Sequence, residues 1–188
     1  MIEMNRRSTK AVSGNDLILH YRQEGDIYRL VHYVLHGDGN HAPVYVGGKG
    51  ISLYPKISEQ QIAEEMLKVQ ILHQKCKGLR IRQEFAVITF DELHKGRRGF
   101  SQICKIADWY GDYYFYRGFQ CVYGVFQEAD RYVIRYAINT VSGIDGSKYI
   151  YNVNEIRDEE QRCLRWIVGT IMGREPGVEF DFRELEYY

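Results

Sequence analysis

Two apolar, β-branched segments separated by a short polar link constrain the fold of this chain more than any other feature. They are CVYGVF (121–126) and YVIRYAINTV (132–141), and QEADR joins them. Runs of this length and composition are typical of strands, and a short polar link between two of them favours a hairpin. We therefore predict a pair of adjacent antiparallel strands at the centre of a sheet.

The rest of the chain alternates between helical and extended patterns. Ser58 and Gln61 have the spacing of a capping box, which marks the start of one helix. The expected helices cover residues 26–35 (closed by Gly37), 58–76, 99–110 and 154–173. The expected strands, besides the hairpin, cover residues 16–21, 44–46 and 85–90, with a short extension at 149–153. This alternation predicts an α+β fold, in which one mostly antiparallel central sheet carries helices packed on one face.

Composition indicates an ordinary globular chain. A length of 188 residues with 45% hydrophobic side chains suits a single domain (1–188) with a real core, in which 154–188 form a C-terminal helix and an acidic tail. No apolar run approaches the roughly 20 residues of a membrane helix, and the first residues lack a signal-peptide core. The four cysteines form no C-x-x-C pair, as expected for buried, reduced thiols. We therefore expect a cytoplasmic protein without a membrane partner.

Charge is balanced overall but uneven locally. A formal net charge of zero argues against a strongly electrostatic nucleic-acid binder. Cations nevertheless gather between residues 75 and 98. They are Lys75, Lys77, Arg80, Arg82, Lys95, Arg97 and Arg98. This segment predicts either a face that contacts phosphates or a solvated surface.

The hairpin and the residues after it resemble the third motif of the conjugative relaxases (mobilisation nucleases), members of the HUH endonuclease superfamily. In that motif a strand ending in Val-His-x-Asp/Glu turns into a strand carrying His-x-His, followed by Asn-Thr/Ser-Val-Ser and a Gly-Lys. The matching residues here are Val125, Asn139, Thr140, Val141, Ser142, Gly146 and Lys148. The places of the three metal-binding histidines hold Phe126, Val133 and Arg135.

Other segments resemble the same family in the same order, over roughly residues 26–150. They are LVHYVLHGDGNH (from Leu30), VGGKGIS, AEEMLKVQILHQKCKG, RIRQEFAVITFDE and IADWYGDYYFYRGFQCVYGV. The first is similar to the helix that carries the DNA-attacking tyrosine, and the glycine-rich segment with the helix after it looks like those of Gram-positive mobilisation proteins. The resemblance implies a relaxase-like sandwich and an origin in a plasmid or integrative mobile element.

The resemblance also implies a chemistry. A relaxase breaks one phosphodiester by tyrosine attack while a metal polarises the phosphate. By motif position the nucleophile, or its relic, is Tyr33, although a tyrosine on an amphipathic helix also serves simply as packing. Phe126 and Val133 cannot bind a metal, whereas Arg135 suits a phosphate oxygen or pairs with Glu128. We therefore expect no metal cofactor at these places and little or no nicking.

Histidines and carboxylates elsewhere offer alternative ligands. His32 and His36 lie one helical turn apart in HYVLHGDGNH, a spacing able to chelate a metal. Simple solvation is the other interpretation of these side chains. The further candidates are His41 and Asp38 beside that pair, and Glu128, Asp130 and Asp145 for magnesium.

The aromatic run WYGDYYFYRGF (109–119) also has two interpretations. It can stack single-stranded bases with help from Arg117, or it can pack the core, which is the interpretation we favour. The C-terminal FDFRELEYY is either a docking segment or a frayed end.

Three functions remain in competition. The preferred one is a relaxase-like protein that binds single-stranded or origin-of-transfer DNA, or relaxosome and coupling proteins, without efficient nicking. The alternatives are an active relaxase that uses Tyr33 in a rebuilt site, and a protein-interaction module on a recycled fold. The predicted DNA- or phosphate-binding residues are Arg135, Glu128, Arg80, Arg82, Arg97, Arg98, Arg117 and Lys148.

Overall fold

Helices and strands alternate along most of the chain, as the sequence predicts. The computed structural model describes residues 24–37, 39, 41–53, 58–75, 81–89, 97–128, 131–149 and 155–172. The helices are α1 (Glu24–His36), α2 (Glu59–Leu72), α3 (Arg97–Tyr116) and α4 (Glu155–Met172). The strands are β1 (Tyr45–Lys49), β2 (Ile81–Thr89), β3 (Cys121–Glu128) and β4 (Arg131–Asn139). The strand expected at 16–21 and the acidic tail lie outside the described residues.

The four strands form one antiparallel sheet in the order β1-β3-β4-β2. The predicted hairpin is its central pair, with Phe126 opposite Val133 and Gly124 opposite Arg135. β1 pairs with the outer side of β3, and β2 pairs with the outer side of β4. The prediction of an α+β chain with a mostly antiparallel central sheet is thus confirmed for the described strands.

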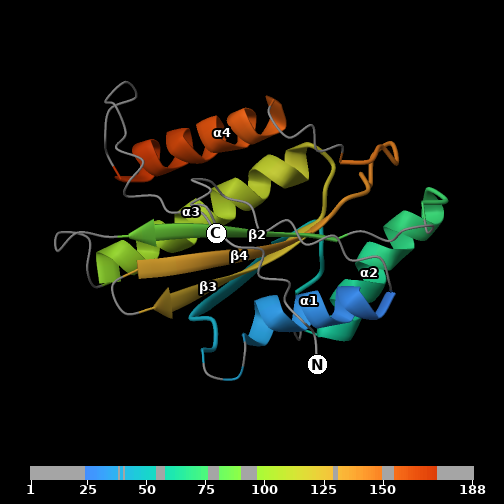
Figure 1. The fold of residues 1–188 in the computed structure, drawn as a ribbon, viewed down its shortest axis with the longest axis horizontal. Helices are drawn as coiled ribbons and strands as arrows, with labels where there is room; N and C mark the ends of the chain where they lie inside the picture. Colours follow the sequence, from blue (N-terminus) through green and yellow to red (C-terminus); the bar gives the residue numbers. More distant parts are fainter. Residues whose placement is uncertain are drawn as a thin grey trace, which may run out of the picture.

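Helices cover both faces of this sheet, so the prediction of helices on one face was wrong. Figure 1 shows α3 and α4 on one side and α1 and α2 on the other. The reason lies in the hairpin, whose two faces are both apolar. Tyr123 and Tyr136 belong to the core under α3 and α4, while Val122 and Ala137 belong to the core under α1 and α2. A strand that is apolar on both faces needs cover on both sides.

Two glycines allow large groups to approach the sheet closely. A Cβ on Gly124 would lie 2.3 Å from the backbone oxygen of Val34, so α1 can rest on β3 only because this residue has no side chain. A Cβ on Gly47 would lie 2.4 Å from the ring of Tyr123. The glycine-rich segment at 47–50 is therefore partly strand β1, which makes room for an aromatic ring on the neighbouring strand.

Local signals account well for where the helices begin and end. Ser58 caps α2, where its side chain accepts a hydrogen bond from the backbone N–H of Gln61 at 3.3 Å. Gly37 ends α1 with φ 76°, and its N–H donates to the carbonyl of Tyr33 at 2.9 Å. α3 runs to Tyr116, six residues beyond the predicted end at 110 (116 minus 110), because the aromatic run continues the helix.

Candidate functional site

The three residues at the family's metal-ligand places lie together on the sheet face under α1 and α2. Phe126 and Val133 face each other across the hairpin and form a small buried cluster. Arg135 lies two residues further along β4 and is 7% exposed. Side chains alternate along each strand, and Phe126 pairs with Val133 across the hairpin, so these residues share one face of the sheet. Two of these side chains are apolar and the third is a cation, so none of them offers a ligand atom to a metal.

Arg135 packs against two aromatic rings. Its Cζ lies 4.1 Å from the ring centroid of Phe126 and 4.5 Å from that of Tyr33. Both distances are in the range of cation–π contacts, which are stronger when the cation is desolvated. Tyr33 is half-buried on α1, so its ring contributes to the packing of this helix on the sheet. The structure thus brings the candidate nucleophile and the candidate phosphate-binding arginine into direct contact.

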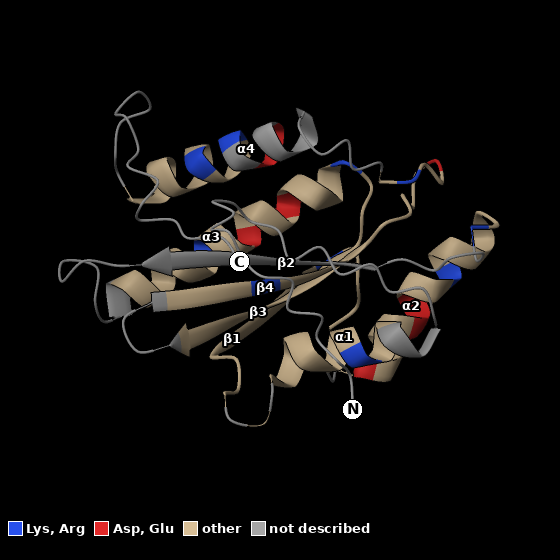
Figure 2. Ribbon diagram, in the orientation of Figure 1, with Lys and Arg blue, Asp and Glu red and all other residues tan. Residues whose placement is uncertain are grey.

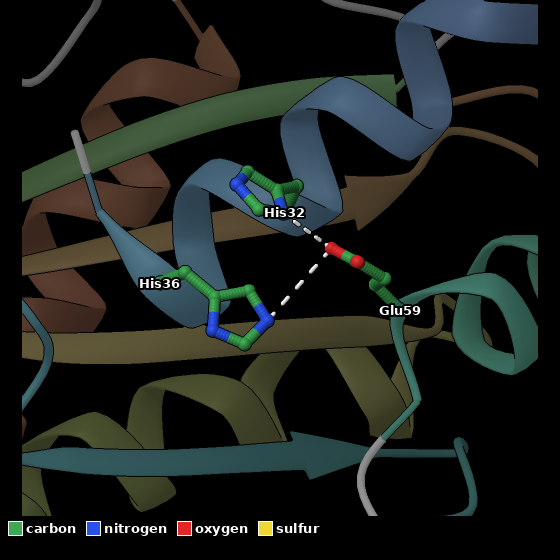
Figure 3. Close-up of side chains that lie close together, drawn as sticks. All are labelled: His32, His36 and Glu59. Carbon is green, nitrogen blue, oxygen red and sulfur yellow. Dashed lines mark hydrogen bonds and ion pairs between the residues drawn. The ribbon is translucent and has the colours of Figure 1, made fainter. Parts of the chain in front are cut away.

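A second group of side chains joins α1 to the start of α2. Figure 3 shows His32 and His36, one helical turn apart, turned toward the carboxylate of Glu59. The Nδ1 atom of His32 lies 2.5 Å from Oε2 of Glu59, and Nε2 of His36 lies 3.8 Å from the same oxygen. The predicted histidine pair is therefore brought together. The carboxylate of this group belongs to Glu59, which was not predicted from the sequence. Glu59 is 27 positions after His32, so no local spacing links the two residues.

The other predicted metal ligands do not extend this group. His41 is exposed and stands outside the cluster that the described residues form. Asp38 and Asp130 lie outside the described residues, as does the side chain of Glu128. Asp145 is exposed in the turn after β4, and the backbone N–H of Ser147 lowers the pKa of its carboxyl to about 2. The proposed magnesium set therefore stays a prediction.

The motif after β4 builds a turn. Asn139 is fully buried and its amide donates to the carbonyl of Met66 at 3.0 Å and accepts from the amide of Gln70 at 2.8 Å, which ties the end of the sheet to α2. Ser142 accepts a hydrogen bond from the N–H of Ile144 at 3.2 Å, inside the turn. The polar groups of these motif residues thus satisfy the backbone of a tight connection.

The predicted phosphate-binding residues are only partly described. Arg80 lies outside the described residues, and so do the side chains of Arg82, Arg97 and Arg98. Lys148 is exposed beside the bridge that its backbone makes with Val141. In Figure 2 the described cations are spread over several helices, which also carry acidic residues. The contribution of the 75–98 segment to DNA binding therefore stays a prediction.

The aromatic run mainly packs the core. Tyr110 and Tyr114 are fully buried, and the ring of Tyr110 makes an edge contact with Tyr136. Arg117, one of the predicted DNA-binding residues, forms an ion pair with Glu159 of α4 at 2.5 Å, and its contact with DNA stays a prediction. The exceptions among the large rings are Trp109, Phe115 and Tyr116, which are 40%, 45% and 80% exposed.

A polar cluster beside β1 was not anticipated from the sequence. Asp108 of α3 accepts hydrogen bonds from the hydroxyls of Tyr45, at 3.1 Å, and Tyr123, at 2.5 Å. Burial, together with the carboxylate of Asp108, raises the pKa of Tyr45 to about 12 and that of Tyr123 well above its usual range. Protonated hydroxyls are therefore favoured here, which indicates a structural role. No periodicity in the sequence links these residues, because they lie on three different elements.

Comparison with known proteins adds no assignment. No protein-family model, no curated protein and no solved structure matches this chain. The resemblance to relaxases therefore rests on the motifs quoted above. Within the described part of the chain, no helix has both the length and the apolar character needed to cross a membrane.

Proposed function

We propose that this chain is a relaxase-like protein of a mobile genetic element, which binds single-stranded or origin-of-transfer DNA, or relaxosome partners, without efficient nicking. The observation that supports it best is the packing of Arg135 between Phe126 and Tyr33. These are the residues that stand where the resemblance calls for metal ligands and the attacking tyrosine. By the resemblance, Arg135 puts a cation at the place of one metal-binding histidine, and this cation contacts the candidate nucleophile.

The chemistry of this arrangement favours holding DNA over cutting it. A guanidinium can neutralise a phosphate, but it does not replace a Lewis acid that also orients the attack. Loss of one preorganised electrostatic stabiliser costs an enzyme on the order of 10²–10³ in rate, and loss of a metal site should cost at least as much. Arg135 is largely covered, so we assign most phosphate contacts to the basic 75–98 segment.

DNA binding can be tested with a matched pair of charge-reversal proteins. We expect weak, salt-sensitive binding to a varied single-stranded oligonucleotide pool, measured by fluorescence anisotropy. The first protein changes Arg80, Arg82, Arg97 and Arg98 to Glu. The control changes four exposed cations of the described helices to Glu, namely Arg29, Lys105, Arg162 and Arg165. Binding should be lost in the first and kept in the control. Equal loss in both, or no binding by the wild type at low salt, contradicts the proposal.

Nicking is tested by a covalent-adduct assay. The wild-type protein is incubated with single-stranded oligonucleotides and Mn²⁺ or Mg²⁺ and resolved on denaturing gels, with Tyr33→Phe and Tyr28→Phe run beside it. We expect no shifted band in any lane. A protease-sensitive band that disappears in Tyr33→Phe and persists in Tyr28→Phe would refute the proposal and support an active relaxase.

A protein-interaction module is the second candidate, and one observation favours it. Trp109 of α3 and Trp166 of α4 stack at 6.0 Å between ring centroids while remaining 40% and 57% exposed. Tryptophan is enriched at interfaces between proteins relative to the rest of the surface. The discriminating result is the DNA assay above, because this candidate predicts no binding at low salt.

A further inference from the structure

The group formed by His32, His36 and Glu59 lies on two helices that share a buried core. α1 and α2 pack against each other and against one face of the sheet through a shared core. Val31 and Ile62 belong to this core. The histidines lie on the exposed side of α1, and Glu59 is the first residue of α2, directly after its cap. The packing of α1 on α2 therefore fixes the three backbones relative to one another, while the side chains are 58%, 55% and 41% exposed.

The distances within this group are close to those of a metal site. The three ligand atoms all lie within 4.8 Å of one another. A tetrahedral zinc site with ligand distances of about 2.0–2.2 Å holds its ligand atoms roughly 3.3–3.5 Å apart. The contacts of 2.5 Å and 3.8 Å from Glu59 to the two histidines therefore need adjustments of about 1 Å or less, and the longest separation in the group, at most 4.8 Å, needs about 1.5 Å or less. The histidine side chains are 58% and 55% exposed, so rotation about their χ angles can provide this.

The ligand types select the class of ion. Two imidazoles and one carboxylate suit zinc and its neighbours among the transition metals, whereas magnesium and calcium prefer all-oxygen sites. Three protein ligands leave a fourth position of a tetrahedral ion for water or an anionic oxygen. We propose that His32, His36 and Glu59 bind one divalent transition-metal ion of the zinc class and thereby clamp α1 to α2. This site goes beyond the proposed DNA binding and does not depend on it.

The first measurement is zinc binding to the full chain, freed of any affinity tag and of metal. Isothermal titration with Zn²⁺ should show one ion bound per chain in the micromolar range or tighter. His36→Ala should weaken binding by more than about 100-fold, because even changes around a ligand cost 10- to 100-fold. His41→Ala is the matched control, since it removes an exposed histidine of the same segment that is not in the group. It should bind as the wild type does.

Coordination is then checked by spectroscopy and by stability. Co²⁺ in place of zinc should give the intense visible absorption of a tetrahedral site in the wild type, and Glu59→Gln should lose or shift it while the fold stays intact by circular dichroism. Zn²⁺ at about 100 times its dissociation constant should raise the Tm by roughly 5–10 °C in the wild type and not in His36→Ala. Absence of zinc binding, or equal binding by His36→Ala and the wild type, overturns the proposal and leaves a simple hydrogen bond between His32 and Glu59.

Discussion

Gly124 should be among the least replaceable residues of the described chain. It lies on β3 beneath α1, and a Cβ at this position would stand 2.3 Å from the backbone oxygen of Val34 and 3.1 Å from the ring of Phe126. Gly124→Ala adds only one methyl group. The nearest atom it meets belongs to a helix backbone, which cannot rotate away as a side chain can.

The expected cost follows from these distances. Ordinary contact begins at 3.4 Å, so α1 must move away from the sheet by 3.4 minus 2.3, or about 1.1 Å. Close-packed interiors resist such movement, and overpacking a core typically costs about 1–3 kcal/mol. A backbone clash belongs at the upper end of that range. At roughly 2–4 °C per kcal/mol for a chain of this size, the Tm should fall by about 4–12 °C.

The assay compares thermal and urea unfolding of two single variants. Gly143→Ala is the control, because the nearest atom to its new Cβ is the carbonyl oxygen of Gly118 at 3.7 Å, an ordinary contact. Its free energy of unfolding should stay within about 0.5 kcal/mol of the wild type. The reasoning is refuted if Gly124→Ala is as stable as the wild type, or if Gly143→Ala loses as much stability.

The remaining predictions concern three polar groups. The pKa of Tyr45 is about 12 in the folded state and near 10 in the unfolded state, so the folded protein holds this proton more tightly and its free energy of unfolding should decline as pH rises from 10 to 12. Asp108→Asn should reduce that decline, which urea unfolding at a series of pH values would measure. Asn139→Ala leaves buried partners unsatisfied and should lose about 2–4 kcal/mol in chemical denaturation, whereas an unchanged midpoint would contradict its structural role. Arg135→Lys removes the planar stack on Tyr33 and should cost about 1 kcal/mol; no change in unfolding would mean that this contact is weak.

Local patterns determined most of the secondary structure. The two apolar runs predicted the β3–β4 hairpin, and the cap at Ser58 predicted the start of α2. These features depend on neighbouring residues alone, because strand alternation, helical spacing and capping act over a few positions. Alternation along β4 is enough to place Val133 and Arg135 on one face, whereas the pairing register of the two strands brings Phe126 to the same face.

The layering of the fold was decided by tertiary packing. The sequence showed apolar residues on both sides of the hairpin, but it did not show which helix would cover which face. That choice depends on close contacts between distant residues, such as Gly124 beneath Val34, which let α1 approach β3. The end of α3 was missed for a related reason, since its aromatic residues continue the helix by packing against the sheet and α4.

The candidate sites also combine features that local sequence determines with contacts that only the tertiary structure creates. One turn of helix was enough to pair His32 with His36, because their spacing is a local property of α1. Glu59 completes the group only because α2 packs against α1, and Tyr33 meets Arg135 only because α1 lies on the sheet. Single-sequence patterns carry the chemistry of each side chain, whereas the contacts between elements decide which side chains act together.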